Sequence, residues 1–163
     1  MDINKIILIF PIFGCHHKER VIHIIPMVGI DSLVKFNDEK SKVDINLKSS
    51  KEEEEDYNSH SGGKYYKSVS LYIHFTGNYP FRVFCISISA SCFDFIYIKD
   101  KGVYHKFSGI SSIEKFKLTF KNYKIMMNKS GMLIPDLGIS VEFQNGKMYK
   151  VDFYEKGRLW FNY

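Results

Sequence analysis

From about residue 64 onward, apolar and polar residues alternate in pieces of strand length, and this alternation restricts the possible folds more than any other feature of the chain. Residues 68–75 carry an apolar side chain at every second position, and residues 81–89 carry apolar side chains on both sides of the alternation. A period of two places one set of side chains on one face of a strand, and a strand that is apolar on both faces is typical of a sheet interior. The pattern therefore predicts strands, with residues 81–89 central and buried.

Turn residues separate these pieces at short intervals. Asn145-Gly146 lies between the alternating runs 139–143 and 148–154, and Asp100-Lys101-Gly102 follows the run 93–99. Asn-Gly is the strongest short-range signal for a hairpin, because both residues accept the positive φ of a type I′ turn. These segments predict two hairpins.

One stretch, residues 111–127, is ambiguous. Ser111 or Ser112 followed by Glu114 could begin a short helical turn, whereas residues 116–120 alternate as a strand does. We predict a strand from about Lys115.

The composition also favours strands. Apolar residues make up 45% of the chain and aromatic residues 16%, and Ala90 is the one alanine among 163 residues. β-Branched and aromatic residues favour a pleated surface, and alanine favours a helix. We predict an all-β fold, a small antiparallel sandwich or partly open barrel with about seven or eight short strands.

The net charge of +5 is unevenly distributed. Residues 64–163 hold 15 Lys and Arg against 7 Asp and Glu, whereas residues 1–63 hold 8 against 11. A cationic body favours an acidic protein, a nucleic acid or an anionic lipid surface as partner. The other interpretation is that lysines keep a small β-domain soluble and protect its sheet edges.

Three regions follow from these patterns. Residues 64–163 form the β-domain, residues 15–63 a stem with short extended segments, and residues 1–14 a separate leading segment. Within the stem, residues 49–64 contain four consecutive glutamates and almost no apolar residue. Such a segment buries too little surface to offset the entropy of ordering, so we interpret it as a flexible acidic linker.

The leading segment contains an apolar run at residues 6–14, interrupted by Pro11 and followed by Cys15 and a charged sequence. The run is too short to span a bilayer, which needs roughly 20 apolar residues. Its length is typical of the core of a signal peptide.

Ile12-Phe13-Gly14-Cys15 resembles the lipobox of bacterial lipoproteins, with Gly14 and Cys15 as the matching positions. The resemblance implies a bacterial source, removal of residues 1–14 as a signal peptide, and acylation of Cys15 by chains such as palmitate that anchor the protein in a membrane. His16 rather than Asp after the cysteine resembles the sorting pattern for the periplasmic face of the outer membrane. The alternative is that residues 6–13 form a buried first strand and Cys15 is a core cysteine.

Cys85 and Cys92 remain as a pair if Cys15 is acylated. In an oxidising periplasm this pair is a candidate disulfide across a tight hairpin. Two buried free thiols are the equal alternative.

No motif for catalysis, a cofactor or a metal stands out. The chain has no Gly-rich phosphate loop and no GxSxG or HExxH pattern, and its six histidines are not spaced as zinc ligands. Cys85 with His74 or His105 as base is conceivable, but an apolar strand buries that sulfur and makes it unreactive. We therefore expect no enzyme activity, no catalytic residue, no cofactor and no metal.

The first functional hypothesis is a non-enzymatic envelope lipoprotein whose cationic β-domain binds another protein. In architecture alone it resembles periplasmic immunity lipoproteins, which implies an immunity or inhibitor role. The alternative is an intracellular β-domain that binds nucleic acid or another anionic partner. Nucleic acid is the less expected partner, because the cations are scattered and no RNP-like motif is present.

Overall fold

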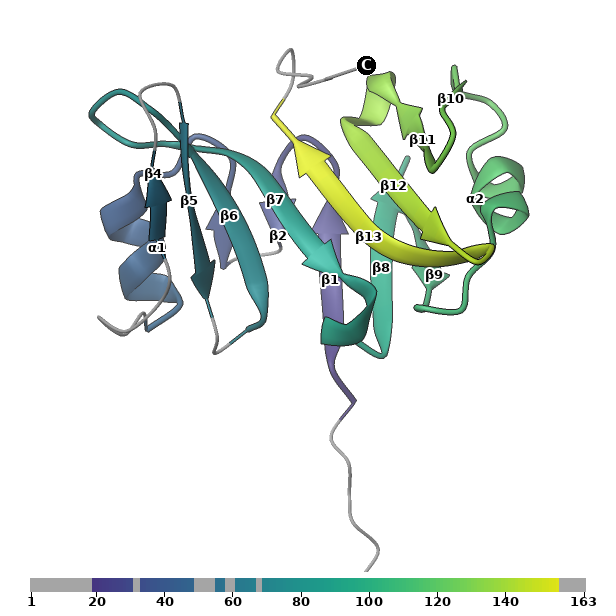
Figure 1. Ribbon diagram of the computed structural model, residues 1–163, viewed down its shortest axis with the longest axis horizontal. Helices are drawn as coiled ribbons and strands as arrows, with labels where there is room; N and C mark the ends of the chain where they lie inside the picture. The colour runs from purple at the N-terminus through teal and green to yellow at the C-terminus, as the bar shows by residue number, and fades with distance from the viewer. Residues whose placement is uncertain (1–18, 31–32, 49–54, 58–60, 67–68, 156–163) are drawn as a thin grey trace, which may run out of the picture.

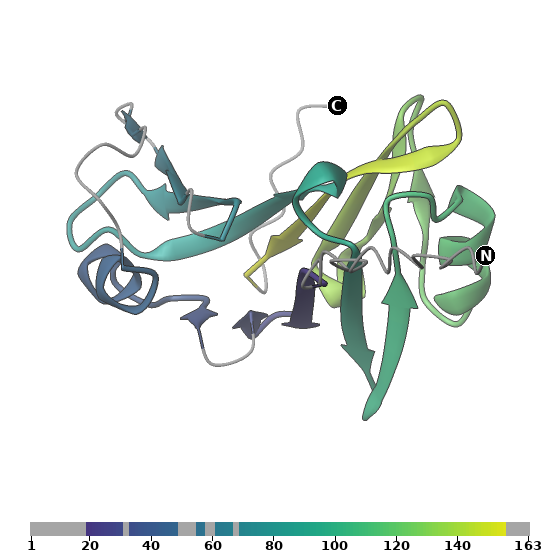
Figure 2. The same ribbon diagram turned by 90° about the horizontal axis from the view of Figure 1, so that it is seen from below.

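The strands form two sheets that pack against each other. The computed structural model describes residues 19–30, 33–48, 55–57, 61–66 and 69–155. Within these ranges the larger sheet has eight strands in the order β10-β11-β12-β13-β7-β6-β5-β4, and the smaller has five in the order β3-β2-β1-β8-β9. Figure 1 shows β1 and β8 of the smaller sheet behind the middle of the larger one, and Figure 2 shows the two layers from below.

All neighbouring strands of the larger sheet are antiparallel. Its strands are β4 (Glu55–Tyr57), β5 (Ser61–Tyr66), β6 (Leu71–Thr76), β7 (Val83–Ser89), β10 (Met126–Met127), β11 (Gly131–Ile134), β12 (Ile139–Gln144) and β13 (Lys147–Tyr154). The central strand β7 is buried over most of its length, as its two-sided apolar pattern predicts.

The smaller sheet contains one parallel pair. Its strands are β1 (Val21–Ile25), β2 (Gly29–Ile30), β3 (Val34–Lys35), β8 (Phe95–Asp100) and β9 (Val103–Phe107). β1 runs parallel to β8, whereas the other pairs of this sheet are antiparallel. The helical elements are α1 (Lys40–Asn46), the 3₁₀ turn η1 (Ala90–Cys92), α2 (Ile113–Thr119) and the 3₁₀ turn η2 (Pro135–Leu137).

The all-β prediction is confirmed, and so are the two hairpins. Asn145 and Gly146 have φ values of 52° and 72° between β12 and β13, and Lys101 and Gly102 have 46° and 85° between β8 and β9. The described residues hold thirteen strands rather than seven or eight. The excess arises because two-residue strands such as β2, β3 and β10 are too short to alternate visibly, and because residues before 64 also enter the sheets.

The segment predicted as a stem contributes to the core of the β-domain. Ile24, Ile30, Val34, Val43 and Leu47 are buried in the same apolar cluster as the interior of the larger sheet. The β-domain therefore includes described residues from Val21 onward, and not only those after Lys64. The sequence did not reveal this because β1 joins the rest of the fold through β8, which lies more than 70 residues away and pairs with it in parallel.

The acidic linker predicted at residues 49–64 is described only in part. Residues 49–54 and 58–60 lie outside the described residues. The remainder supplies β4 and the start of β5, which pair antiparallel at one edge of the larger sheet. The leading segment, with the lipobox-like residues and Cys15, also lies outside the described residues.

The strand predicted from Lys115 is wrong, because these residues form α2. Ser112 caps the helix, its hydroxyl accepting a hydrogen bond from the Lys115 amide at 3.3 Å. Phe116 and Phe120 are fully buried, whereas Leu118 between them is 70% exposed. An i, i+4 pair on one face of a helix also satisfies a period of two, so the alternation alone could not separate the two structures.

The packing of α2 yields a stability prediction. Phe116 stacks on Phe107 of β9 with ring centroids 4.0 Å apart. Phe116→Ala should lower the free energy of unfolding by about 3–5 kcal/mol, because it removes a buried ring and leaves a cavity. Urea denaturation measures the loss. The matched control Leu118→Ala, on the exposed side of the same helix, should change stability by less than about 0.5 kcal/mol. Equal losses for the two variants would contradict the burial of Phe116.

Candidate functional site

The outer face of the smaller sheet carries rings and lysines side by side. On β8, Ile96 and Ile98 point into the core, so the intervening residues point outward. The outward positions of β1, β8 and β9 together form what we call the aromatic-lysine face: His23, Phe95, Tyr97, Lys99, Tyr104 and Lys106.

Cross-strand pairing holds these side chains in contact. Tyr97 lies opposite Lys106, and Lys99 lies opposite Tyr104. The Lys106 Nζ is 3.4 Å from the ring centroid of Phe95 and 5.8 Å from that of Tyr97, and the Lys99 Nζ is 5.5 Å from that of Tyr104. An ammonium group over an aromatic face is attracted by the ring quadrupole. The ammonium groups of both lysines therefore lie next to the rings, with Lys99 half-buried and Lys106 exposed.

The imidazole of His23 extends this arrangement to β1. It stacks on Tyr97 with ring centroids 5.0 Å apart and an interplanar angle of 10°, and it meets the edge of Tyr104 at 5.5 Å. Tyr104 remains 43% exposed. The face combines positive charge with partly exposed rings and contains no acidic residue among its six members. Partly exposed tyrosines are enriched in the energetically important part of protein-binding surfaces.

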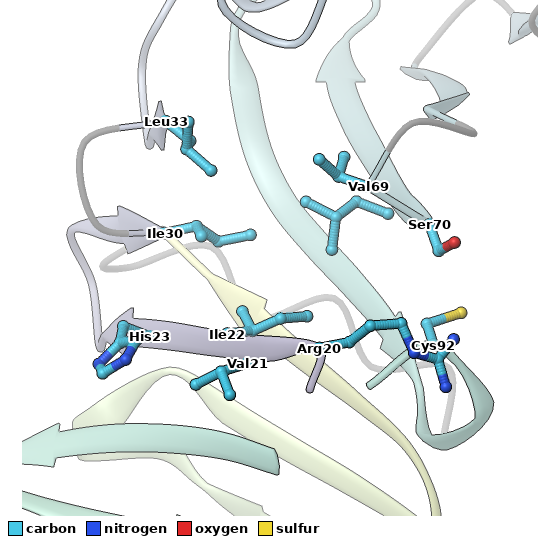
Figure 3. A pocket seen from close by; sticks show the side chains of 10 residues that line it. Arg20, Val21, Ile22, His23, Ile30, Leu33, Val69, Ser70 and Cys92 are labelled. Atoms are coloured by element: carbon cyan, nitrogen blue, oxygen red, sulfur yellow. The ribbon is translucent and has the colours of Figure 1, made fainter. Parts of the chain in front are cut away.

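An apolar cavity of about 270 Å³ lies between the smaller sheet and the start of β6. Ile22 and Ile30 extend from β1 and β2 toward Val69, and Leu33 lies above them, whereas Arg20 and Cys92 lie at the end next to η1 (Figure 3). His23, which belongs to the aromatic-lysine face, is also among the residues that line the cavity. Its size and lining suit one apolar side chain of a partner.

The candidate disulfide is not formed, because Cys85 and Cys92 are both free thiols. Cys85 lies within β7, and Cys92 lies in η1 beyond the end of that strand. The strand advances about 3.3 Å per residue, so the four residues from Cys85 to Ser89 carry the chain about 13 Å from Cys85 before η1 begins. No hairpin brings them together. Burial and the neighbouring Asp152 raise the pKa of the Cys85 thiol well above its usual value, which keeps it protonated and weakly reactive.

His74 lies beside Cys85 on the neighbouring strand. Its Nε2 is 3.0 Å from the Ser87 hydroxyl oxygen. Burial, together with the positive charge of Lys150, lowers the pKa of His74 to about 4. The imidazole is therefore neutral at physiological pH. His105, the other base considered for Cys85, instead packs against Phe120 with ring centroids 5.8 Å apart.

Metal sites and membrane helices were also sought in the described ranges. There, no group of three His, Cys, Asp or Glu side chains is arranged to hold a metal ion. None of the helices in the same ranges is both long and apolar enough to cross a membrane.

Comparisons with protein-family models, with curated proteins and with solved structures give no match for this chain. The functional argument therefore depends on the geometry of the site. Sequence reasoning recognised the cationic character of residues 64–163 but did not locate the aromatic-lysine face. The signal was present in the alternate positions Phe95, Tyr97 and Lys99, but the contribution of His23 depends on the parallel pairing of β1 with β8.

The depressed pKa of His74 predicts a pH dependence of stability. The imidazole titrates near pH 6.5 in the unfolded chain but near pH 4 in the folded one, so below pH 6.5 the unfolded chain binds a proton that the folded chain does not. The contribution of His74 is complete above pH 6.5 and should fall by up to about 3 kcal/mol as the pH drops to 4. Urea denaturation of the wild type and of His74→Asn at intervals from pH 7.5 to 4 measures it. Stability should fall more steeply in the wild type, and parallel curves would contradict the assignment.

Proposed function

We propose that this chain is a non-enzymatic binding protein of the bacterial cell envelope, in which the aromatic-lysine face binds an acidic surface of another protein. More specifically, it acts as an immunity or inhibitor protein in this proposal. Acylated Cys15 anchors it at the periplasmic face of the outer membrane. The observation that carries the binding role is the fixed position of Lys99 and Lys106 over the rings of the face.

Preorganised lysines favour binding for an energetic reason. A free lysine loses rotamer entropy when a partner immobilises it, whereas a lysine already held on a ring has lost part of that entropy beforehand. The positive charge of the face accelerates encounter with an acidic surface, and the rings supply contact area once the surfaces meet. The adjacent cavity offers a place for one apolar side chain of the partner, next to His23.

The start of the fold limits the length of the tether. β1 begins at Val21, six residues after Cys15, so an anchor on Cys15 would hold the domain within about 22 Å of the membrane. β8 runs parallel to β1, so the β8–β9 turn lies at the end of the sheet opposite the start of β1. The aromatic-lysine face would therefore extend away from the membrane toward the Lys101-Gly102 turn.

Charge reversal on the face tests the binding role. A blocked acidic peptide with one central leucine should bind the wild type, and Lys106→Glu or Lys99→Glu should weaken binding by about tenfold each, because each variant places a repulsive charge in the face. Fluorescence anisotropy at low and physiological salt measures the dissociation constant. The control Lys129→Glu, an exposed lysine outside the face, should have much less effect.

Two outcomes would contradict this assignment. Equal weakening by Lys129→Glu would mean that net charge rather than the face attracts the peptide. Tighter and strongly salt-dependent binding of single-stranded DNA would favour the nucleic-acid alternative.

In cells, a photo-crosslinking residue at position 104 should yield one discrete protein adduct. The same residue at position 149 on β13, where Tyr149 is 52% exposed, should not yield that adduct.

The membrane anchor has a separate test. Mass spectrometry of the mature protein should find an amino terminus at Cys15 that carries acyl chains, and the wild type should fractionate with membranes. Cys15→Ser should release the protein from the membrane fraction without altering its fold, because several acyl chains together provide the anchoring free energy. An intact chain that retains Met1 and has no acyl mass would exclude the anchor. It would not affect the binding role, which is tested by the charge-reversal variants.

A further inference from the structure

The outer face of the larger sheet carries a second and different cluster of polar side chains. Cross-strand pairing aligns Ser87 with Asp152, and it aligns Cys85 with both His74 and Tyr154. A cavity of about 200 Å³ opens among these residues. It lies on the opposite sheet from the aromatic-lysine face, so it is independent of the proposed function.

Asp152 is the unusual member of this cluster. Its side chain is 7% exposed, and its Oδ2 lies 3.1 Å from the Nζ of Lys150. In the part of the chain that the structure describes, its Oδ1 is buried and has no hydrogen-bond partner. A buried carboxylate oxygen without a donor is destabilising, and such groups are uncommon in folded proteins. Asp152 lines the cavity, so a molecule bound there can supply the missing donor once a small rotation of the carboxylate turns the Oδ1 toward it.

The charges around the cavity favour a cation as that molecule. Lys150 contacts Asp152 and also Glu142, with its Nζ 2.9 Å from the Glu142 Oε1. With both carboxyl groups ionised, one positive and two negative side chains leave a formal charge of −1; burial raises the pKa of Asp152, and a bound cation would favour its ionised form. His74, which also lines the cavity, is neutral at physiological pH and does not change this sum. A single positive charge would therefore make the cluster neutral.

The walls of the cavity suit the apolar part of an organic cation. Phe84 and Tyr154 are almost fully buried, and they line the cavity beside the polar groups. Aromatic rings attract ammonium and guanidinium groups through their quadrupole and pack against attached methylenes. A bare metal ion would lack a full set of ligands here, since the described residues form no cluster of three that could hold one.

We propose that this cavity binds a small organic monocation, an alkylammonium or alkylguanidinium group, which donates a hydrogen bond to the Asp152 Oδ1 and packs against Tyr154. The group can belong to a free small molecule or to a lysine or arginine side chain of another protein. The shared chemistry is one positive N–H donor on a short apolar chain.

Titration with matched probes tests the proposal. Ethylguanidinium and n-butylammonium should shift the amide resonances of residues around His74, Ser87 and Asp152 in a two-dimensional NMR spectrum, whereas butyrate and butanol should not. Acetyl-Gly-Arg-Gly-amide and acetyl-Gly-Lys-Gly-amide distinguish the source. Tighter binding of the peptides than of the free cations indicates a protein side chain, and exclusion of the peptides indicates a free small molecule.

Two variants of residues that line the cavity should change the affinity for ethylguanidinium in opposite directions. Asp152→Asn, which keeps the shape but removes the charge, should weaken ethylguanidinium binding by at least about tenfold. Lys150→Met, which removes the competing cation, should tighten it. The control Glu114→Gln removes one negative charge from the exposed side of α2 and should leave binding unchanged. The NMR spectrum of each variant reports that it is folded.

The proposal is overturned if none of the four cationic probes shifts these resonances, or if Asp152→Asn binds as tightly as the wild type. Preferential binding of butyrate, lost in Lys150→Met, would reassign the cavity to an anion. None of these results affects the aromatic-lysine face, which is tested with different variants.

Discussion

The parallel pairing of β1 with β8 joins the two parts of the smaller sheet, whose apolar face packs against the larger sheet. Four consecutive residue pairs from Val21 and Phe95 to Ile24 and Ile98 join the start of the fold to its middle. This pairing buries Ile24 beside Ile96 and Ile98, and it leads into β2 and β3, which bury Ile30 and Val34. Without β1, the β8–β9 hairpin would be an isolated two-stranded unit, which is marginally stable in water.

The alternation of side chains along the strands determines which residues each outer surface presents. One surface of the smaller sheet buries isoleucines, so the other presents the rings and lysines of alternate positions. The larger sheet repeats this logic: Ile73, Ile86 and Val151 point into the core, while His74, Ser87 and Asp152 point outward. The two outer faces differ in charge, however, because lysines dominate on the smaller sheet and a buried acid lies on the larger one. Two chemically different sites can therefore coexist on one small domain.

The alternating pattern was informative where the pairing partner was close in sequence. β6, β7 and the two hairpins could be predicted, since Asn145-Gly146 and Lys101-Gly102 specify tight turns and set the strands next to one another. α2 could not, because Phe116, Leu118 and Phe120 fit both a strand and one side of a helix. The stem assignment failed for Val21–Ile25 because its partner β8 lies more than 70 residues away in the sequence.

The sequence by itself determined the β-rich class of the fold, the positions of its tightest turns and the cationic character of the domain, because each depends on residues within a few positions of one another. Only the tertiary structure decided that Val21–Leu47 completes the core, that His23 joins Tyr97 and Lys106 on one face, and that the Asp152 Oδ1 lies buried without a donor. Those features depend on contacts between segments far apart in the chain. Local propensity carries no information about such contacts, since they form only when burial of apolar surface selects one arrangement of the whole chain.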